Sequence, residues 1–376
     1  MEYKINTKRL KEIMFKDLDY IFFLTIVFSV VYGLVILKSA TLTIDRGESI
    51  LRSQIMATAL GIIAMIILTI VDYRLWKNFY RLIYGLCIAV LIATLIFGIG
   101  DKTHGARSWL KIGGFVFQPA EFVKLGLIIS LSAYIEENVD DIQNPLTVIK
   151  LAIFAFVPVF LILIQPDFGT AMVFVFFIFV MFFAVGLDIR YFLAVIIPGI
   201  LALPLIWMKL EPYQKNRFLV LFKTEELSQS WAYQLNEGII AIGSGKFFGK
   251  GLGKGSQTQF NFIPKKYNDS IFPVVAEELG FLGAGGLIVL YGIMLYRMVK
   301  VSKESPDTFG QMMVIGFVAV LFFHIFEAIG MTLGILPMTG IPLPFFSQGG
   351  TFQLTNLAIA GLVLSVSLHR SQIYYY

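Results

Sequence analysis

The feature that most constrains this chain is a series of apolar runs, each close to the length of a helix that crosses a bilayer. A hydrocarbon core about 30 Å thick needs about 20 apolar residues per helix. Ten candidate runs lie at about 19–39, 53–71, 79–99, 118–135, 148–164, 169–187, 191–208, 271–297, 310–335 and 350–368. The sequence therefore predicts an all-α, polytopic membrane protein with about ten transmembrane helices, in a single domain over residues 1–376.

Composition excludes the other broad classes of protein. Of the 376 residues, 57% are hydrophobic and only 15% are charged, whereas soluble domains carry about 25% charged residues. A soluble enzyme could not cover its surface with this supply, and the apolar content is too high for a disordered chain. The single cysteine, Cys87, excludes an internal disulfide framework. The three histidines lie far apart and show no metal-ligand spacing, so no metal site is predicted.

Two interruptions in the apolar pattern are informative. Residues 165–168 (Gln-Pro-Asp-Phe) separate the fifth run from the sixth, and they predict a tight turn at a membrane surface. Residues 339–351 contain two prolines and three glycines between the ninth and tenth runs. Non-helical backbone at membrane depth survives only where protein buries it or where it lines a cavity. His324 and Glu327, one turn apart in the ninth run, would face that cavity or each other.

The distribution of basic residues predicts the orientation. Ten spans place both termini on one side, and Lys and Arg accumulate in short cytoplasmic segments. With the N-terminus inside, short inner segments hold fourteen of the 30 Lys and Arg residues, and short outer segments hold six. We therefore expect a cytoplasmic N-terminal tail (about 1–18), a short cytoplasmic C-terminal tail (about 369–376) and one large extracytoplasmic loop (about 209–270).

The large outer loop is cationic, with nine basic and five acidic residues. Such a loop suits an anionic ligand at the outer membrane face, although a solvated linker would have a similar composition. Within it, residues 243–255 hold six glycines and three lysines spaced by four. Glycines let the backbone approach a ligand and lysines bind phosphate, so either a phosphate-containing lipid site or a flexible loop fits. The segment is not a Walker A loop.

Several charged residues lie where the outer loop meets the eighth run. Asp269 is placed to act as a general base at the membrane surface, or to cap the following helix. Lys265 and Lys266 could bind an anionic group beside it. Glu277 and Glu278 lie about two turns further on, and we expect a structural role, with one of them paired to a cation inside the membrane.

A second group of charges lies in the fourth run. Glu121 and Lys124 are spaced i, i+3 and share one helix face. They could form a local ion pair, or a charged wall of an interior cavity in which Lys124 supplies the cation for Glu277 or Glu278. Arg107, just before this run, could reach a phosphate or the carboxylates.

Five motifs in this order resemble those of the SEDS family, named for shape, elongation, division and sporulation. They are residues 118–124, 165–170, 243–257, 269–280 and 339–350. The similarity covers about residues 18–370, and it is greatest to the members that act in cell elongation. Two residues beside Asp269 depart from the family pattern, Asn268 where Thr is usual and Ser270 where Phe is usual.

The resemblance implies an activity and a partner. SEDS proteins are glycosyltransferases that polymerise lipid II into peptidoglycan strands at the outer face of the bacterial cytoplasmic membrane, for elongation and cell shape. They work with a class B penicillin-binding protein, which crosslinks the strands. The resemblance assigns the family's essential aspartate to Asp269 and its intramembrane pair to Glu121 and Lys124. It also gives four further site-lining positions, Arg107, Gln165, Asp167 and Lys250.

A mechanism follows as a hypothesis. Asp269 would accept the proton of the acceptor sugar's hydroxyl as general base. Arg107, Lys124 and the lysine-rich loop would stabilise the pyrophosphate leaving group. A divalent cation, Mg²⁺ or Mn²⁺, could assist, although the sequence contains no recognisable metal cage. The alternatives are a lipid II flippase or other membrane transporter, and a scaffold for a synthase partner. No nucleic-acid ligand is expected.

Overall fold

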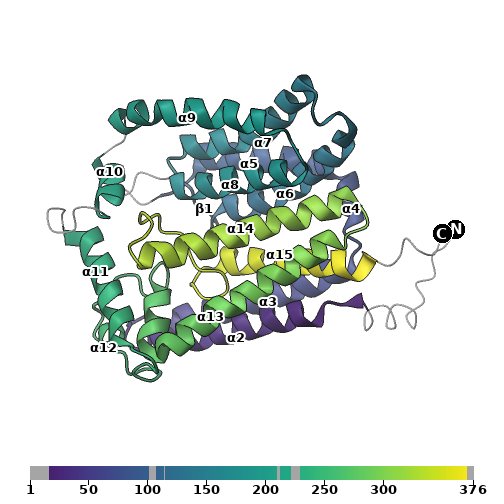
Figure 1. Cartoon of the computed structure of the whole chain (residues 1–376). Helices are drawn as coiled ribbons and strands as arrows, with labels where there is room; N and C mark the ends of the chain where they lie inside the picture. The colour runs from purple at the N-terminus through teal and green to yellow at the C-terminus, as the bar shows by residue number, and fades with distance from the viewer. Residues whose placement is uncertain (1–16, 101–106, 114, 210–211, 222–228, 371–376) are drawn as a thin grey trace.

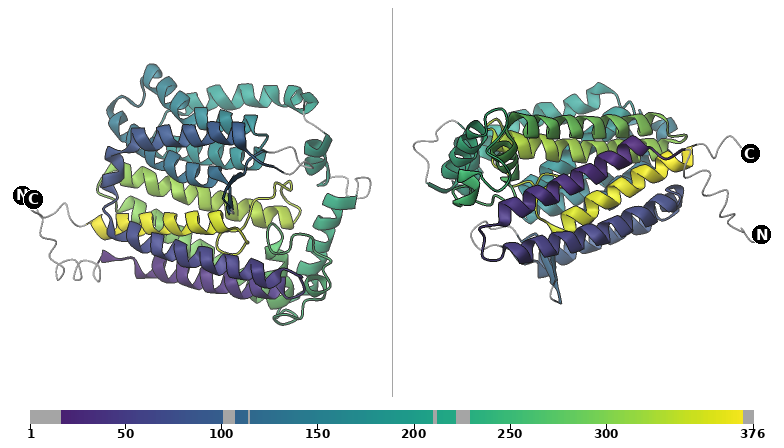
Figure 2. Two further views of the ribbon diagram at one scale, coloured as in Figure 1. Left: turned by 180° about the vertical axis from the view of Figure 1, so that it is seen from behind. Right: turned by 90° about the horizontal axis from the view of Figure 1, so that it is seen from below.

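The computed structural model describes residues 17–100, 107–113, 115–209, 212–221 and 229–370 (Figure 1). Ten long helices form one bundle with roughly parallel axes (Figures 1 and 2). They are α2 (Tyr20–Thr41), α3 (Gly47–Ile70), α5 (Tyr80–Phe97), α6 (Pro119–Glu137), α7 (Pro145–Ile164), α8 (Phe168–Ala184), α9 (Ile189–Lys209), α13 (Ile271–Lys303), α14 (Thr308–Thr332) and α15 (Gly350–His369). Shorter elements are α4 (Arg74–Asn78), the 3-10 helix η1 (Val139–Asp141), α10 (Pro212–Leu219), α11 (Gln229–Ser244) and α12 (Ser256–Gln259).

Each of the ten predicted apolar runs is a helix, so the all-α prediction is confirmed. Among the described residues, seven helices are long and apolar enough to cross a membrane, and α8 and the first part of α9 are shorter apolar helices. The remaining one, α6, carries Glu121 and Lys124 in its interior. The predicted turn between the fifth and sixth runs is also confirmed, because α7 ends at Ile164 and α8 begins at Phe168.

The core of the bundle is built around α14 and α15. In their most apolar stretches, 72% of α14 and 89% of α15 is buried inside the protein. Helix α14 packs on α6, α8 and α13, and α15 lies along α3. Glycines permit the α3–α15 contact: a Cβ added at Gly61 would lie 2.5 Å from a Leu357 methyl carbon, and one at Gly361 would lie 2.6 Å from the Met65 carbonyl oxygen. A side chain at either glycine would force the two helices apart.

The two ends of the bundle differ. At one end the start and finish of the described chain meet, since the Ser367 hydroxyl donates to the Asp17 carbonyl oxygen (3.0 Å). There the Arg297 guanidinium of α13 also pairs with Asp19, with the closest N···O distance at 2.7 Å. The opposite end carries α10, α11 and α12 (Figure 1). The two described chain ends thus share one face, while its cytoplasmic location stays a prediction.

The segment predicted to be a large outer loop contains more regular structure than expected, because α10, α11 and α12 all lie in it. A small hairpin before α6 was not predicted. Its strands β1 (Leu110–Ile112) and β2 (Phe115–Phe117) pair antiparallel, with Leu110 opposite Phe117 and Ile112 opposite Phe115. Three-residue strands are too short to show an alternating pattern in the sequence.

Candidate functional site

Asp269 lies directly before α13, at the end of the bundle that carries α11. That helix begins at Ile271 with Ser270 as its N-cap residue, so Asp269 does not occupy the capping position that the sequence left open. Its side chain is 14% exposed and its Oδ2 atom lies 3.9 Å from the Lys265 Nζ atom. A Cβ added at Gly340 would come within 3.4 Å of the same oxygen. The carboxylate therefore faces a narrow space beside the segment that joins α14 to α15.

Three hydrogen bonds hold the residues next to Asp269 in place. The Gln348 amide donates to the Tyr267 carbonyl oxygen (2.8 Å). The Ser347 hydroxyl donates to the Asn268 carbonyl oxygen (2.6 Å). From α11, the Gln234 side-chain amide donates to the Ser270 hydroxyl (2.9 Å). The proline-rich segment predicted to be buried or to line a cavity thus packs against the residues that carry Asp269.

Burial and two cations set the protonation of Asp269. Burial disfavours the charged form and raises the pKa of Asp269 to about 6, although Lys265 and Arg217 favour that form. Arg217 comes from α10 and donates to the Thr339 carbonyl oxygen (3.4 Å). The sequence did not indicate Arg217 as a site residue, because it lies in a long segment without a recognisable motif. The site therefore holds a carboxyl group that can gain and lose a proton near neutral pH.

A second polar cluster lies inside the bundle. The Glu121 and Lys124 side chains form an ion pair at 2.8 Å and are only 7% and 4% exposed. The Lys124 Nζ atom also lies 2.9 Å from the His324 Nε2 atom and 5.7 Å from the centre of the Phe352 ring. Lys124 is therefore held by α6, α14 and α15, and the expectation that it pairs with Glu277 or Glu278 is wrong.

Glu327 bonds to the segment that faces Asp269. It lies one turn after His324 on α14, and its Oε1 atom accepts a hydrogen bond from the Thr339 hydroxyl (3.0 Å). Thr339 precedes Gly340, which faces Asp269. His324 and Glu327 do not bond to each other in the structure, since each has a partner on a different element. Glu327 therefore lies one helical turn from the cluster of Lys124 and His324 and bonds to the segment that faces Asp269.

Glu277 fastens the glycine- and lysine-rich segment to α13, and Glu278 joins α13 to α2. The buried Glu277 carboxylate accepts from the Lys250 ammonium (2.8 Å) and from the backbone amides of Gln257 and Thr258 (2.9 Å each). Glu278 accepts from the Ser39 hydroxyl, with O···O distances of 2.6 and 2.7 Å. The two carboxylates thus bond to donors from α2, from α12 and from Lys250.

Lys266 and the turn after α7 are similarly engaged in local bonds. The Lys266 ammonium donates to the Thr258 carbonyl oxygen (2.5 Å), and burial lowers the pKa of Lys266 to about 8. Asp167 caps α8 by accepting from the Thr170 amide (3.2 Å). The Gln165 side chain donates to the Leu91 carbonyl oxygen (3.2 Å). Arg107 is exposed before the hairpin.

The described residues contain no group of three His, Cys, Asp or Glu side chains that could hold a metal ion. The protein groups that converge near Asp269 are instead cations, Lys265 and Arg217. Such groups suit an anionic ligand beside a titratable carboxylate.

Comparisons with known proteins agree on one family. The sequence profile of the FtsW/RodA/SpoVE cell cycle proteins matches residues 19–372. The chain is 32% identical to the peptidoglycan glycosyltransferase MrdB of Escherichia coli (strain K12) over 358 residues, which cover 95% of each chain. It is also 32% identical to the stage V sporulation protein E of Bacillus subtilis (strain 168) over 317 residues, 84% of this chain and 86% of that one.

Two solved structures are similar over nearly the whole chain. One is a chain from a peptidoglycan synthase complex described as coordinating polymerization and crosslinking, with a TM-score of 0.81, 30% identity, and coverage of 94% of this chain and 99% of that one. The other is the rod shape determining protein RodA of Thermus thermophilus, with a TM-score of 0.71, 29% identity, and coverage of 94% and 98%.

Proposed function

The chain belongs to the FtsW/RodA/SpoVE family of cell cycle proteins, and from that membership we propose that it polymerises lipid II into glycan strands at the outer face of the bacterial cytoplasmic membrane. It is a multi-pass membrane protein and a peptidoglycan glycosyltransferase, as its relatives' names and apolar helices indicate. Both termini are proposed to be cytoplasmic, which places the Asp269 end of the bundle outside.

Asp269 is the proposed general base, and its geometry is the observation that carries this assignment. The carboxylate is largely buried, does not cap α13, and has a pKa raised to about 6. At pH 7 such a group is mostly ionised and can still accept a proton. The acceptor hydroxyl gives its proton to Asp269 while its oxygen bonds to the donor sugar's anomeric carbon. The bond from that carbon to the lipid-pyrophosphate oxygen breaks, and the pyrophosphate leaves as an anion.

Cations near Asp269 are proposed to stabilise the leaving group. Lys265 lies 3.9 Å from the carboxylate, and Arg217 is close enough to lower its pKa. Preorganised positive charge at a developing anion commonly contributes a large share of catalysis. Arg107 is exposed and available to a phosphate. We assign Lys124 and Glu121 to the inner wall of the same region, because Lys124 contacts His324, one helical turn from Glu327, and Glu327 bonds to Thr339 beside the Asp269 site.

The other candidate site residues are proposed to shape the site rather than touch the reacting atoms. Each has a local partner: Lys250 with Glu277, Glu278 with Ser39, and Lys266 with Thr258. The turn of Gln165 and Asp167 lies beside the Thr339 segment, since a Cβ at Gly169 would lie 3.4 Å from the Thr339 carbonyl oxygen. Changes at these positions should alter stability before they alter chemistry.

A penicillin-binding transpeptidase of class B is the proposed partner. A similar chain occurs in a synthase complex that coordinates polymerization and crosslinking. A polymerase that releases strands at the outer membrane face needs a crosslinking enzyme on the same side. Lipid II and the nascent strand, both lipid-linked, can remain in the outer leaflet throughout.

A lipid II flippase is the second candidate, and the buried Glu121–Lys124 pair inside the bundle favours it. The two functions are distinguished by giving labelled lipid II to the purified chain in vesicles, with and without a transpeptidase partner. Polymerisation predicts glycan strands on a gel. Translocation without polymer, measured by loss of label from one leaflet, would contradict the proposal and support the flippase.

A further inference from the structure

The bend in α13 lies about one bilayer thickness from the charged residues at the far end of the same helix. Gly280 has a left-handed backbone (φ 67°, ψ −162°) that interrupts the helix. Arg297 is the first charged residue beyond the bend, and it pairs with Asp19 at the opposite end of the bundle. About 20 helical residues cross a core about 30 Å thick. Counting that length back from Arg297 reaches Glu278, two residues before the bend at Gly280.

The turn of residues 246–249 is fastened to α13 at this depth. The Phe281 amide donates to the Lys246 carbonyl oxygen (2.8 Å), and the Leu282 amide donates to the Phe247 carbonyl oxygen (3.2 Å). Gly249 is required for the approach, because a Cβ there would lie 2.2 Å from the Glu278 carbonyl oxygen. The turn therefore cannot rise far from the membrane boundary without breaking these bonds.

Three aromatic rings project from this turn and the bend. Phe247 is 52% exposed, Phe248 is 78% exposed and Phe281 is 66% exposed. Phe247 stacks on Phe281, with ring centres 5.8 Å apart, and meets Phe248 edge-on at 5.0 Å. The patch continues along α13 into Leu282 and Val289, which are 53% and 61% exposed. Exposed apolar surface that continues along a membrane-spanning helix belongs in lipid.

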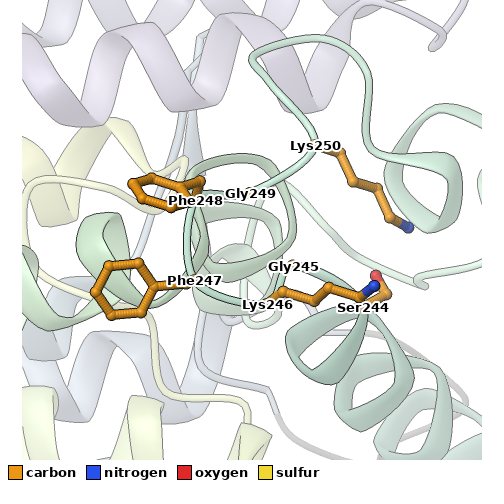
Figure 3. A pocket seen from close by; sticks show the side chains of 7 residues that line it. All are labelled: Ser244, Gly245, Lys246, Phe247, Phe248, Gly249 and Lys250. Carbon is orange, nitrogen blue, oxygen red and sulfur yellow. The ribbon is translucent and has the colours of Figure 1, made fainter.

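The opposite side of the turn is cationic. Figure 3 shows the rings of Phe247 and Phe248 on one side of the pocket and the ammonium groups of Lys246 and Lys250 on the other. Lys250 is held by Glu277, whereas Lys246 and Lys254 are exposed. Long basic side chains beside aromatic rings that enter the lipid reach towards lipid phosphates at an interface.

We propose that the turn of residues 246–248, together with Phe281, is an interfacial lipid-binding site. The three rings lie among the outer-leaflet acyl chains, and Lys246 binds the phosphate of an anionic phospholipid. The occupant is a bulk membrane lipid rather than the reacting substrate, because the turn contacts α13 beyond Glu278 while Asp269 precedes the helix. The proposal adds a lipid site to the proposed glycosyltransferase and does not depend on its activity.

The depth of the turn is tested by spin labelling. Cys87 is the sole cysteine and is buried, so Cys87→Ala gives a background into which Phe248→Cys is introduced. Val289→Cys serves as the lipid reference and Ser256→Cys as the aqueous reference, since both residues are exposed. Each label is measured in nanodiscs that hold one copy of the chain, which excludes coverage by a second copy. We expect the label at 248 to meet oxygen more often, and a water-soluble nickel chelate less often, than the label at 256. Equal nickel access at the two positions would overturn the proposal.

The preference for anionic lipid is tested separately. Native mass spectrometry of the full chain measures retention of phosphatidylglycerol against phosphatidylcholine. Lys246→Gln is expected to lower the apparent affinity for phosphatidylglycerol about five-fold, the effect of one lysine near an anionic surface. The matched control is Lys111→Gln, another exposed lysine at the outer end. Equal loss in both variants, or equal binding of the two lipids by the unmodified chain, would refute the anionic site.

Discussion

At the residue scale, the chemistry depends on how one carboxylate is surrounded. Asp269 is buried enough to raise its pKa to about 6, yet Lys265 and Arg217 keep the charged form accessible. The residue after it, Ser270, serves as the N-cap residue of α13 and accepts a bond from Gln234. Asp269 therefore does not cap the helix, so its carboxylate oxygens can accept a hydrogen bond from a substrate.

The first prediction concerns pH. The ionised carboxylate is the base, so the polymerisation rate should rise with pH through about 6 and level off above it, following the pKa of Asp269. Initial rates with labelled lipid II between about pH 5 and about pH 8 measure this rise, which is the acidic limb of the pH–rate profile. Asp269→Asn should remove the limb together with the activity. A flat profile in the unmodified protein would show that Asp269 is not the base.

The second prediction concerns Arg217. Its positive charge favours ionised Asp269, so Arg217→Gln should raise the pKa of that carboxyl and move the acidic limb of the rate profile to higher pH. A purely structural role would lower the rate equally at every pH. Arg190→Gln is the matched control, because Arg190 is an exposed arginine that the predicted orientation places at the inner end. An unshifted limb in Arg217→Gln would contradict the assignment.

At the element scale, the segment between α14 and α15 contacts both Glu327 of α14 and the residues next to Asp269. Its proline and glycine content predicted broken helix, and the structure packs it against residues 267–270. The apolar runs predicted the ten helices because length and hydropathy act locally. Contacts from Arg217 to Asp269 and from Glu277 to Lys250 join residues 52 and 27 positions apart, and no local pattern encodes such pairs. The family resemblance indicated Asp269, and the sequence predicted a structural role for Glu277, but only the structure shows that its partner is Lys250.

The third prediction is that Thr339 positions the segment facing Asp269. Thr339→Val removes the hydroxyl that donates to Glu327 and leaves a buried acceptor unpaired, which costs about 1–3 kcal/mol. We expect kcat to fall with little change in KM, and Thr339→Ser to restore it because it keeps the donor. Steady-state rates of the two variants measure this. If Thr339→Ser is as slow as Thr339→Val, the hydrogen bond is not what matters.

The fourth prediction is that Glu277 stabilises the outer end. Glu277→Ala removes the acceptor of the Lys250 ammonium and of two backbone amides, and leaving a buried donor unsatisfied costs about 1–3 kcal/mol. Thermal unfolding in detergent should show a clearly lower midpoint than for the unmodified chain. Glu48→Gln, which affects an exposed pair with Arg52, should leave the midpoint nearly unchanged. Similar midpoints for both variants would argue against the anchoring role.

At the scale of the whole molecule, all the groups assigned to the reaction lie towards the end that carries α10, α11 and α12, opposite the end where Ser367 meets Asp17 (Figure 1). The distribution of Lys and Arg predicts that this end is outside. One-sided chemistry then needs no passage of substrate through the bundle, which separates the polymerase from the flippase.

The fifth prediction tests that orientation. In a Cys87→Ala background, a membrane-impermeant maleimide added to intact spheroplasts should label Ser256→Cys and leave Lys303→Cys unlabelled until the membrane is opened. Both positions are exposed and lie at opposite ends of the structure. The reverse pattern would place the Asp269 site in the cytoplasm.

The central claim is that Asp269 is the base of a lipid II polymerase, and one comparison tests it most directly. Labelled lipid II and a transpeptidase partner are given to three purified proteins: the unmodified chain, Asp269→Asn and Asp167→Asn. The amount of glycan polymer that each one makes is measured on a gel. Asp167 is a matched outer-end aspartate that caps α8. We predict strands from the unmodified chain and from Asp167→Asn, and a loss of about 10²–10⁴ in rate for Asp269→Asn with an unchanged unfolding midpoint. Full activity in a folded Asp269→Asn protein would contradict the account.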